Sequence, residues 1–229
     1  MRLLELNNLS CQHSEQQILH DITMHVDEGE VVSIIGDNQA GKTTLLQCIS
    51  GLGELGSGEI LFEGTPVHDL SPEKVVESGI IQVPEGGRLF STMTVRENLE
   101  MGAYTTRSRK DLKMRMQKVY ALMPFLEQCD RKPAAALSSY QQEMLAIGRA
   151  LMARPKLLMI DEPSYGMPPT STEALFRVIS EIARQGITIL ITEQSLQYAL
   201  YVSSRIYMVT NSTLVREVAC GVGAKQMAA

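Results

Sequence analysis

The chain has 229 residues, of which 44% are hydrophobic and 21% are charged, and its formal net charge at pH 7 is −5. A chain of this length and composition can bury the core of one large globular domain, or of a core with a smaller lobe. The negative net charge provides no general basic surface for nucleic acid, and every apolar run is too short to cross a membrane. Nucleic-acid-binding proteins and membrane-spanning proteins are therefore disfavoured.

The predicted elements begin with half-exposed strands. Residues 1–30 alternate between apolar and polar side chains and contain the turn sequence Asp-Glu-Gly, which indicates antiparallel strands. Further along, short apolar runs predict buried strands at 31–36, 79–83, 156–161, 187–192 and 205–210. Helical patterns lie between them, around 42–51, 141–154 and 170–185. This alternation predicts an α/β fold with a mostly parallel sheet.

Residues 92–135 are rich in methionine and charge and contain no strand pattern. We interpret them as part of a helical lobe inserted into the α/β core. The expected organisation is a single domain over 1–229, with the core at 1–85 and 155–220 and the lobe from about 86 to 154. The basic stretch 105–118 is interpreted as a solvated helix face; the alternative is a surface that faces anionic lipid or an acidic partner.

The cysteines and the N-terminal residues indicate the cellular compartment of the protein. The cysteines are Cys11, Cys48, Cys129 and Cys220, and no two of them have the spacing of a metal site or a redox motif. The first ten residues are interrupted by Glu5 and lack the pattern of a secretion signal. We therefore expect reduced thiols in a cytoplasmic protein.

A phosphate-binding loop is predicted after the strand at 31–36. The sequence GDNQAGKTT matches G-x-x-x-x-G-K-[ST] between a strand and a helix, which is the context that this pattern requires. Its backbone N–H groups are expected to cradle phosphates, Lys42 to reach the β- and γ-phosphates, and Thr43 to bind Mg²⁺. Gln39 is expected at a positive φ, which costs about 1 kcal/mol. The predicted nucleotide-binding residues of the loop are Gly36, Asp37, Asn38, Gln39, Ala40, Gly41, Lys42, Thr43 and Thr44.

Two carboxylates follow each other at the end of the apolar run 156–161. Asp161 is expected to hold the metal ion, and Glu162 is expected to polarise an attacking water molecule. Beside a phosphate-binding loop we favour this interpretation over a pair of solvated carboxylates before a turn. ATP and Mg²⁺ are therefore the predicted cofactors.

The stretch LSSYQQEMLAIGRALM, residues 137–152, predicts a helix with an unusual start. Its apolar residues recur at helical spacing, and Arg149 is predicted to face solvent. Ser138 and Ser139 are typical of an N-cap, whereas Tyr140 places a large aromatic ring in the first turn. Because free N–H groups at a helix start bind anions, these three residues are candidates for phosphate contact.

Together these motifs resemble the ATP-binding subunit of an ABC transporter, most closely the branched-chain amino-acid importer type and its urea and amide relatives. The resemblance covers residues 2–220. Its strongest stretch is MLAIGRALMARPKLLMIDEPSYGMPP, and VPEGGRLFSTMTVRENLEMGAY and ILITEQSLQYAL also match.

The resemblance implies a dimer of two such domains arranged head to tail. ATP lies between the phosphate-binding loop of one domain and the signature Leu-Ser-Gly-Gly of the other. Closure on ATP moves helices in transmembrane permease subunits, which dock on the helical lobe, and hydrolysis resets them. The chain is therefore expected at the inner face of the cell membrane as a peripheral subunit, without a nucleic-acid partner.

The signature departs from the family pattern. Leu137 and Ser138 are kept, but Ser139 and Tyr140 replace the two glycines that let the backbone approach phosphate closely. Glu143 is predicted to add a repelling carboxylate. We therefore expect the site that this chain completes for its partner to be weakened, and we favour a heterodimer with a related ATPase subunit over a homodimer with slow turnover.

Other residues also depart from the pattern. His13 stands where the family has an aromatic residue that stacks on adenine. Glu85 replaces a glutamine and is still expected to contact the metal ion through water, and Gln194 stands in place of the switch histidine. The resemblance implies that the last two replacements are frequent in this subfamily.

Two alternatives to a transporter ATPase are considered. One is an ATP-binding regulatory clamp with little hydrolysis, because Gln39 and Tyr140 hinder closure. The other is a soluble member of the same superfamily that acts on DNA or ribosomes. A single phosphate-binding loop in 229 residues and a net charge of −5 argue against the second.

Overall fold

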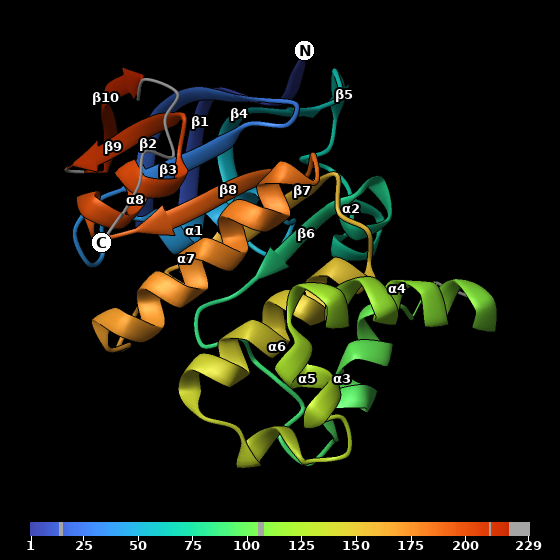
Figure 1. Ribbon diagram of the computed structural model, residues 1–229. Coiled ribbons are helices and arrows are strands. Elements are labelled where there is room, and N and C mark those ends of the chain that lie inside the picture. Colours follow the sequence, from blue (N-terminus) through green and yellow to red (C-terminus); the bar gives the residue numbers. More distant parts are fainter. Residues whose placement is uncertain (14–15, 105–107, 211, 220–229) are drawn as a thin grey trace.

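The fold is built around two β-sheets, and an α/β protein with antiparallel strands at its start is confirmed (Figure 1). The computed structural model describes residues 1–13, 16–104, 108–210 and 212–219. Within these residues the central sheet has the strand order β10-β9-β3-β8-β7-β6, and only β10 is antiparallel to its neighbour. Its strands are β3 (Val31–Ile35), β6 (Ile80–Val83), β7 (Leu157–Asp161), β8 (Thr188–Glu193), β9 (Arg205–Thr210) and β10 (Thr213–Ala219).

The second sheet is antiparallel and has the order β2-β1-β4-β5. Its strands are β1 (Arg2–His13), β2 (Gln16–Asp27), β4 (Glu54–Phe62) and β5 (Thr65–Pro66). The sequence patterns indicated β1 and β2 but not β4 or β5. The first half of β4 contains Gly56 and Gly58 and is largely exposed, so it lacks the apolar run by which buried strands are recognised.

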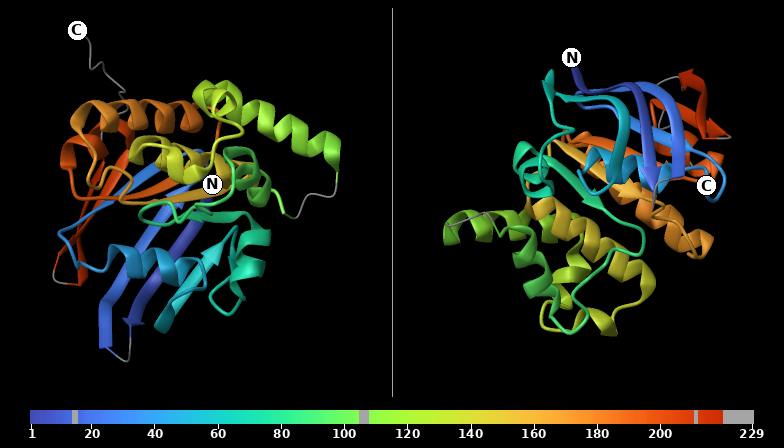
Figure 2. Two further views of the ribbon diagram at one scale, coloured as in Figure 1. Left: turned by 90° about the horizontal axis from the view of Figure 1, so that it is seen from below. Right: turned by 180° about the vertical axis from the view of Figure 1, so that it is seen from behind.

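Helices cover both faces of the central sheet. Helix α1 (Lys42–Ile49) lies between the two sheets, whereas α6 (Ser139–Met152) and α7 (Pro169–Arg184) pack on the opposite face. The remaining helices are α2 (Pro72–Ser78), α3 (Val95–Gly102), α4 (Arg109–Leu122), α5 (Pro124–Gln128), a 3₁₀ turn (Ala134–Ala136) and α8 (Leu196–Val202). Helices α3 to α6 gather at the end of the molecule away from the antiparallel sheet (Figure 2). Among the described helices, none combines the length and the hydrophobicity that crossing a bilayer requires.

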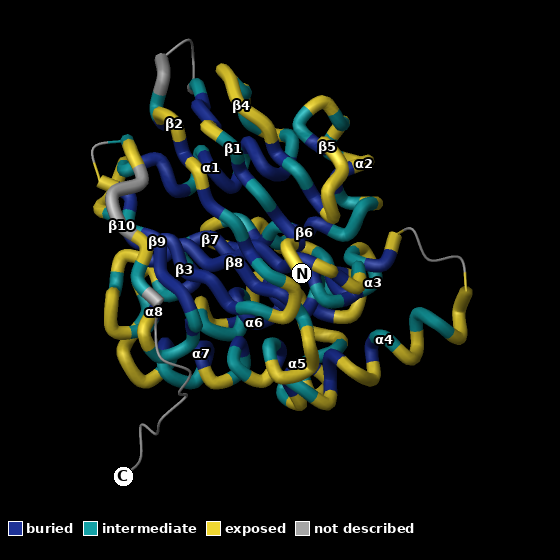
Figure 3. Tube along the Cα trace, turned by 90° about the horizontal axis from the view of Figure 1, so that it is seen from above, coloured by how far each residue is buried: buried dark blue, intermediate teal, exposed yellow. Residues whose placement is uncertain are grey.

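The alternation of side chains along the central strands divides the core into two layers. On β7, Leu158 and Ile160 pack toward α6 and α7, whereas Leu157 and Met159 face α1 and the antiparallel sheet. Figure 3 shows buried residues concentrated along these strands. A parallel sheet covered on both faces has continuous apolar strands, which explains why these runs are recognisable in the sequence.

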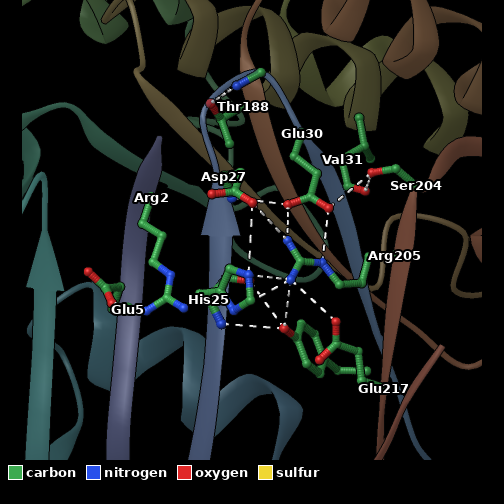
Figure 4. Close-up of polar contacts among 12 residues, drawn as sticks. Arg2, Glu5, His25, Asp27, Glu30, Val31, Thr188, Ser204, Arg205 and Glu217 are labelled. Carbon is green, nitrogen blue, oxygen red and sulfur yellow. Dashed lines mark hydrogen bonds and ion pairs between the residues drawn. The ribbon is translucent and has the colours of Figure 1, made fainter. Parts of the chain in front are cut away.

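A charged cluster joins the two sheets at the start of β3 and β9. Arg205 is only 7% exposed, and its guanidinium contacts Glu30, Asp27 and Glu217, which belong to three different segments (Figure 4). Its Nε lies 3.0 Å from a Glu30 carboxylate oxygen, and a ring nitrogen of His25 lies 2.5 Å from Nη1. The surrounding acceptors therefore compensate for the burial of this cation.

We expect Arg205→Ala to lower the free energy of unfolding by about 3–5 kcal/mol, because it leaves the half-buried Glu30 carboxylate without its partner. The measurement is the midpoint of urea denaturation. Arg184→Ala is the matched control, since Arg184 and Glu181 form an exposed ion pair whose loss should change stability by less than about 1 kcal/mol. Equal losses in the two variants would contradict the expectation.

The fold also brings together two cysteines that are distant in the sequence. Cys11 of β1 and Cys48 of α1 are both buried, and their side chains are hydrogen-bonded to each other. This hydrogen bond and burial raise the pKa of the Cys11 thiol. No spacing rule indicates such a pair, because the contact depends on how α1 packs against the antiparallel sheet. Cys220 lies outside the described residues.

Candidate nucleotide-binding site

The loop predicted to bind phosphate connects β3 to α1, as expected. Two of its glycines are required by close packing: a Cβ on Gly36 would lie 2.7 Å from the Val209 carbonyl oxygen, and one on Gly41 would lie 2.6 Å from Leu19. Gln39 has a φ of 68°, in the left-handed region that the sequence predicted for it. The loop is thus held in one conformation, and the N–H groups at the start of α1 are available to an anion.

Lys42 is already held in place by its own loop. It is 4% exposed, and its ammonium group donates to the carbonyl oxygens of Gly36 (2.7 Å) and Asp37 (2.9 Å). It also forms an ion pair with Glu162 at 2.9 Å. Lys42 is therefore held by its own loop and paired with the carboxylate that follows β7.

A cavity of about 220 Å³ lies over this loop. It is lined by Ile18, Gln39, Gly41, Lys42, Thr43, Thr44 and Glu162. The remaining loop residues, including Ala40, complete the turn beneath it. A cavity at a helix start with free N–H groups is suited to an anion, for which Lys42 can exchange its ion pair with Glu162.

Asp161 is buried at the end of β7. Its Oδ1 accepts a hydrogen bond from the Thr192 hydroxyl at 2.6 Å, but its Oδ2 has no hydrogen-bond partner among the described residues. Burial raises the pKa of this carboxyl, while the hydroxyls of Thr192 and Thr43 favour its ionised form. A buried carboxylate oxygen without a donor is unfavourable unless a cation compensates for it.

The residues therefore fit a bound Mg²⁺. An unpartnered carboxylate oxygen beside a threonine hydroxyl offers the hard oxygen ligands that this ion prefers. No three His, Cys, Asp or Glu side chains in the described part of the chain form a metal cage by themselves. In proteins, Mg²⁺ is usually held by one or two carboxylates together with the phosphates of a substrate.

Glu162 and Gln194 meet beside Lys42. Glu162 has a φ of 44°, and its backbone N–H donates to Thr192. The Gln194 side-chain amide donates to a Glu162 carboxylate oxygen, and it lies 2.5 Å from the Asn38 side-chain oxygen. Glu162 and Gln194, the predicted catalytic residues, thus form a hydrogen-bonded cluster with Asn38 of the phosphate-binding loop.

Glu193, which precedes Gln194, was not among the predicted site residues. It is buried at the end of β8 and accepts hydrogen bonds from the Ser164 hydroxyl (2.9 Å) and backbone N–H (3.2 Å). Burial raises the pKa of Glu193, whereas these hydrogen bonds lower it. It joins the segment after Glu162 to the segment that carries Gln194. The only feature of the sequence that pointed to Glu193 was its position next to Gln194.

None of Ser138, Ser139 or Tyr140 lines the phosphate cavity of its own chain, but Ser139 lines a neighbouring cavity together with Glu162. Ser138 caps the helix, with its hydroxyl accepting from the Gln141 N–H at 3.3 Å. Ser139 is exposed. Tyr140 is half-buried, and its ring centroid lies 6.2 Å from that of Phe125. The aromatic ring therefore packs against the helical lobe.

Two expectations about α6 are wrong. Arg149 does not point into solvent: its guanidinium donates to the carbonyl oxygens of Gly87 (2.7 Å) and Arg88 (3.1 Å), which fastens the loop after β6 to the helix. Glu143 is not a surface residue: it is 5% exposed, and it lines a cavity of about 300 Å³ together with Ser139. Burial, followed by the charge of Asp161, raises the pKa of Glu143 to about 8.

Two further predicted site residues remain. Glu85 is exposed on the loop after β6 and lines a second cavity, of about 300 Å³, together with Glu143 and Glu162. It therefore approaches the end of β7 from the side of the helical lobe. The side chain of His13 lies outside what the structure describes.

Comparisons with known proteins agree with this geometry. Residues 19–165 match the family model described as ABC transporter. The chain is 39% identical to the high-affinity branched-chain amino acid transport ATP-binding protein BraG of Pseudomonas aeruginosa, over 93% of this chain and 91% of that protein. It is 30% identical to the probable branched-chain amino acid transport ATP-binding protein LivF of Archaeoglobus fulgidus, over 91% and 89% of the two chains.

Solved structures give the same result. An ATP-binding cassette of an ABC transporter in its ADP conformation superposes with a TM-score of 0.85 at 27% identity, covering 98% of this chain and 92% of that chain. A nucleotide-free ATP-binding cassette has a TM-score of 0.85 at 26% identity, covering 96% and 92%. The predicted P-loop fold and the predicted ATPase class are thereby confirmed, and the chain belongs to the ABC transporter family, as one of its ATP-binding, ATP-hydrolysing subunits.

Proposed function

We propose that this ATPase energises a membrane importer for branched-chain amino acids or a related small solute. The observation that supports it best is the near-complete match to BraG, together with an intact group of phosphate-binding and carboxylate residues. The solute class rests on the names of the relatives, because an ATPase subunit does not touch the solute.

In the proposed mechanism, the loop from Gly36 to Thr44 binds the phosphates of ATP, and His13 stacks on adenine. Thr43, Asp161 and Glu85 would hold Mg²⁺, and the ion would supply positive charge that neutralises the phosphate oxygens. Lys42 exchanges its ion pair with Glu162 for the β- and γ-phosphates, which leaves the Glu162 carboxylate free to act on water.

Glu162 then serves as the general base, and Gln194 orients it. A carboxylate that accepts a proton from water must lie within hydrogen-bond reach of that water and keep its charge until the reaction. The amide of Gln194 donates to Glu162 and also contacts Asn38, so it links the base to the loop that holds the phosphates. This arrangement supports positioning of the base by Gln194 without a histidine.

The chain is proposed to act in a dimer with transmembrane permeases. Ser138, Ser139 and Tyr140 would complete the nucleotide site of the opposite subunit, and the two replaced glycines favour a heterodimer in which the other signature is intact. A permease would dock on the apolar hollow of about 400 Å³ that separates the helical lobe from the central sheet, which includes the exposed Phe90 and Tyr104. The chain then works at the inner face of the membrane as a peripheral subunit.

The second candidate function is an ATP-binding regulatory clamp with little hydrolysis. Ser139 and Tyr140 favour it, because they stand where the family has two glycines. A clamp would dimerise on ATP without releasing phosphate at an appreciable rate.

The test is co-expression with the membrane proteins encoded beside this chain, followed by purification on a permease tag. We expect the chain to co-purify and the complex in lipid vesicles to release phosphate and accumulate a branched-chain amino acid only with ATP. A chain that binds no permease contradicts the transporter function. A complex that assembles on ATP but releases no phosphate supports the clamp instead.

A further inference from the structure

One oxygen of the buried Glu143 carboxyl group, on α6, has no hydrogen-bond partner among the described residues. The residue is 5% exposed, and its Oε1 contacts neither a donor side chain nor a backbone N–H among the described residues. An ionised carboxylate buried in this way is strongly unfavourable, so the group either stays protonated or is compensated by a cation. The roles proposed above do not use Glu143.

The loop after β6 and Arg149 are the described neighbours of Glu143 on the side of the helix layer. The loop after β6 packs directly over it: a Cβ on Gly87 would lie 2.7 Å from Ala146 and 3.6 Å from the Glu143 Oε2. Arg149 fastens that loop by two hydrogen bonds to carbonyl oxygens, so its own charge is already engaged. Glu143 opens instead onto the cavity of about 300 Å³ that it shares with Glu85 and Glu162.

The second unsatisfied group lies on the neighbouring strand. In the part of the chain that the structure describes, the buried side-chain atoms without a partner are Glu143 Oε1 and Asp161 Oδ2. The Glu143 carboxyl group shares its cavity with Glu162, the residue that follows Asp161 in the chain. The carboxylates of Glu143 and Asp161 are both acceptors, so they cannot satisfy each other when ionised, whereas one cation would compensate both.

We propose that Glu143 is a positioning residue for the divalent cation bound with ATP, acting on it through its charge from the α6 side while Asp161 acts from β7. The proposal rests on the proposed function, because the described residues form no metal cage without phosphates. The consequence is that α6, whose first turn faces the partner's nucleotide, is also coupled to the cation of its own site.

The experiment compares Glu143→Gln with the unaltered protein, using Mn²⁺ as the probe. Free Mn²⁺ is followed by electron paramagnetic resonance during titration of the full chain with saturating ADP. We expect the dissociation constant for Mn²⁺ to rise by about tenfold, the size of effect seen when groups behind metal ligands are removed. Glu77→Gln, an exposed glutamate on α2, is the charge-matched control and should leave the constant unchanged.

ADP affinity in EDTA separates the outcomes. A Glu143→Gln variant that binds ADP normally without metal is folded, and an unchanged Mn²⁺ affinity then overturns the proposal and makes Glu143 a buried neutral acid. If Glu143→Gln does not fold, Glu143→Asp keeps the charge and should still bind Mn²⁺ more weakly because the carboxylate is withdrawn; equal affinity overturns the proposal. Loss of ADP binding in the unaltered protein would instead refute the proposed function.

Discussion

We expect Glu162→Gln to lower ATP turnover by about 10²–10⁴-fold, the contribution of a positioned general base. The amide keeps the shape of the side chain and can still contact Gln194, but it cannot accept the proton of the attacking water. Nucleotide should bind at least as tightly, because the substitution removes the ion pair that occupies Lys42 at 2.9 Å. The measurements are phosphate release in single turnover and binding of a fluorescent ATP analogue.

Two results would contradict this expectation. Unchanged phosphate release would mean that Glu162 only pairs with Lys42. Weaker nucleotide binding would mean that the ion pair supports the loop instead of competing with phosphate. The control is Glu28→Gln, which changes the same charge in the exposed turn between β2 and β3 and should leave both measurements unaltered.

We expect Ser139→Gly combined with Tyr140→Gly to raise the turnover of the homodimer by on the order of 10²-fold, because one backbone donor to a developing oxyanion is worth about that much. Tyr140 packs on Phe125, so the replacement should also loosen the helical lobe slightly. The serine cap at Ser138 is unaffected. Tyr140→Phe retains the ring and should leave turnover unchanged.

Mixed dimers locate the effect. In the first mixture, one subunit carries the two glycines and Glu162→Gln, and the other subunit is unaltered. The phosphate-binding loop and Glu162 of the unaltered subunit then face the restored signature. Turnover in this mixture should rise. In the converse mixture, the glycine subunit keeps Glu162 and the other subunit has Glu162→Gln; turnover should stay low. A rise in the converse mixture alone would show that the signature acts on the nucleotide of its own chain. No rise in either would mean that residues 138–140 only cap the helix.

The phosphate-binding loop shows how far sequence patterns reach. Its glycines, Lys42 and Thr43 are consecutive, and their strand–loop–helix setting is a local property, so both the loop and the strain at Gln39 could be predicted. The pairing of Lys42 with Glu162 could not, because it depends on β3 and β7 ending at the same edge of a sheet in which β8 lies between them.

Helix α6 shows what sequence patterns miss. Its existence follows from a 3.6-residue apolar period, but the period does not say which polar residues are buried with the apolar ones. Arg149 and Glu143 are ordinary surface residues by type, but Glu143 is buried and Arg149 is bonded to the loop after β6, which packs on this helix. Only that packing lets Arg149 bind the loop and leaves a Glu143 carboxyl oxygen without a hydrogen-bond partner among the described residues.

By itself, the sequence determined the strands that are buried on both faces, the loop between β3 and α1 that is predicted to bind phosphate, and the carboxylates at the end of β7, because each depends on residues that are neighbours in the chain. The tertiary structure alone decided the contacts between distant segments: Cys11 with Cys48, Arg205 with three acidic residues, and Glu143 with the charge of Asp161. The physical reason is that burial and charge pairing are set by what packs against a residue, and a one-dimensional pattern does not contain that information.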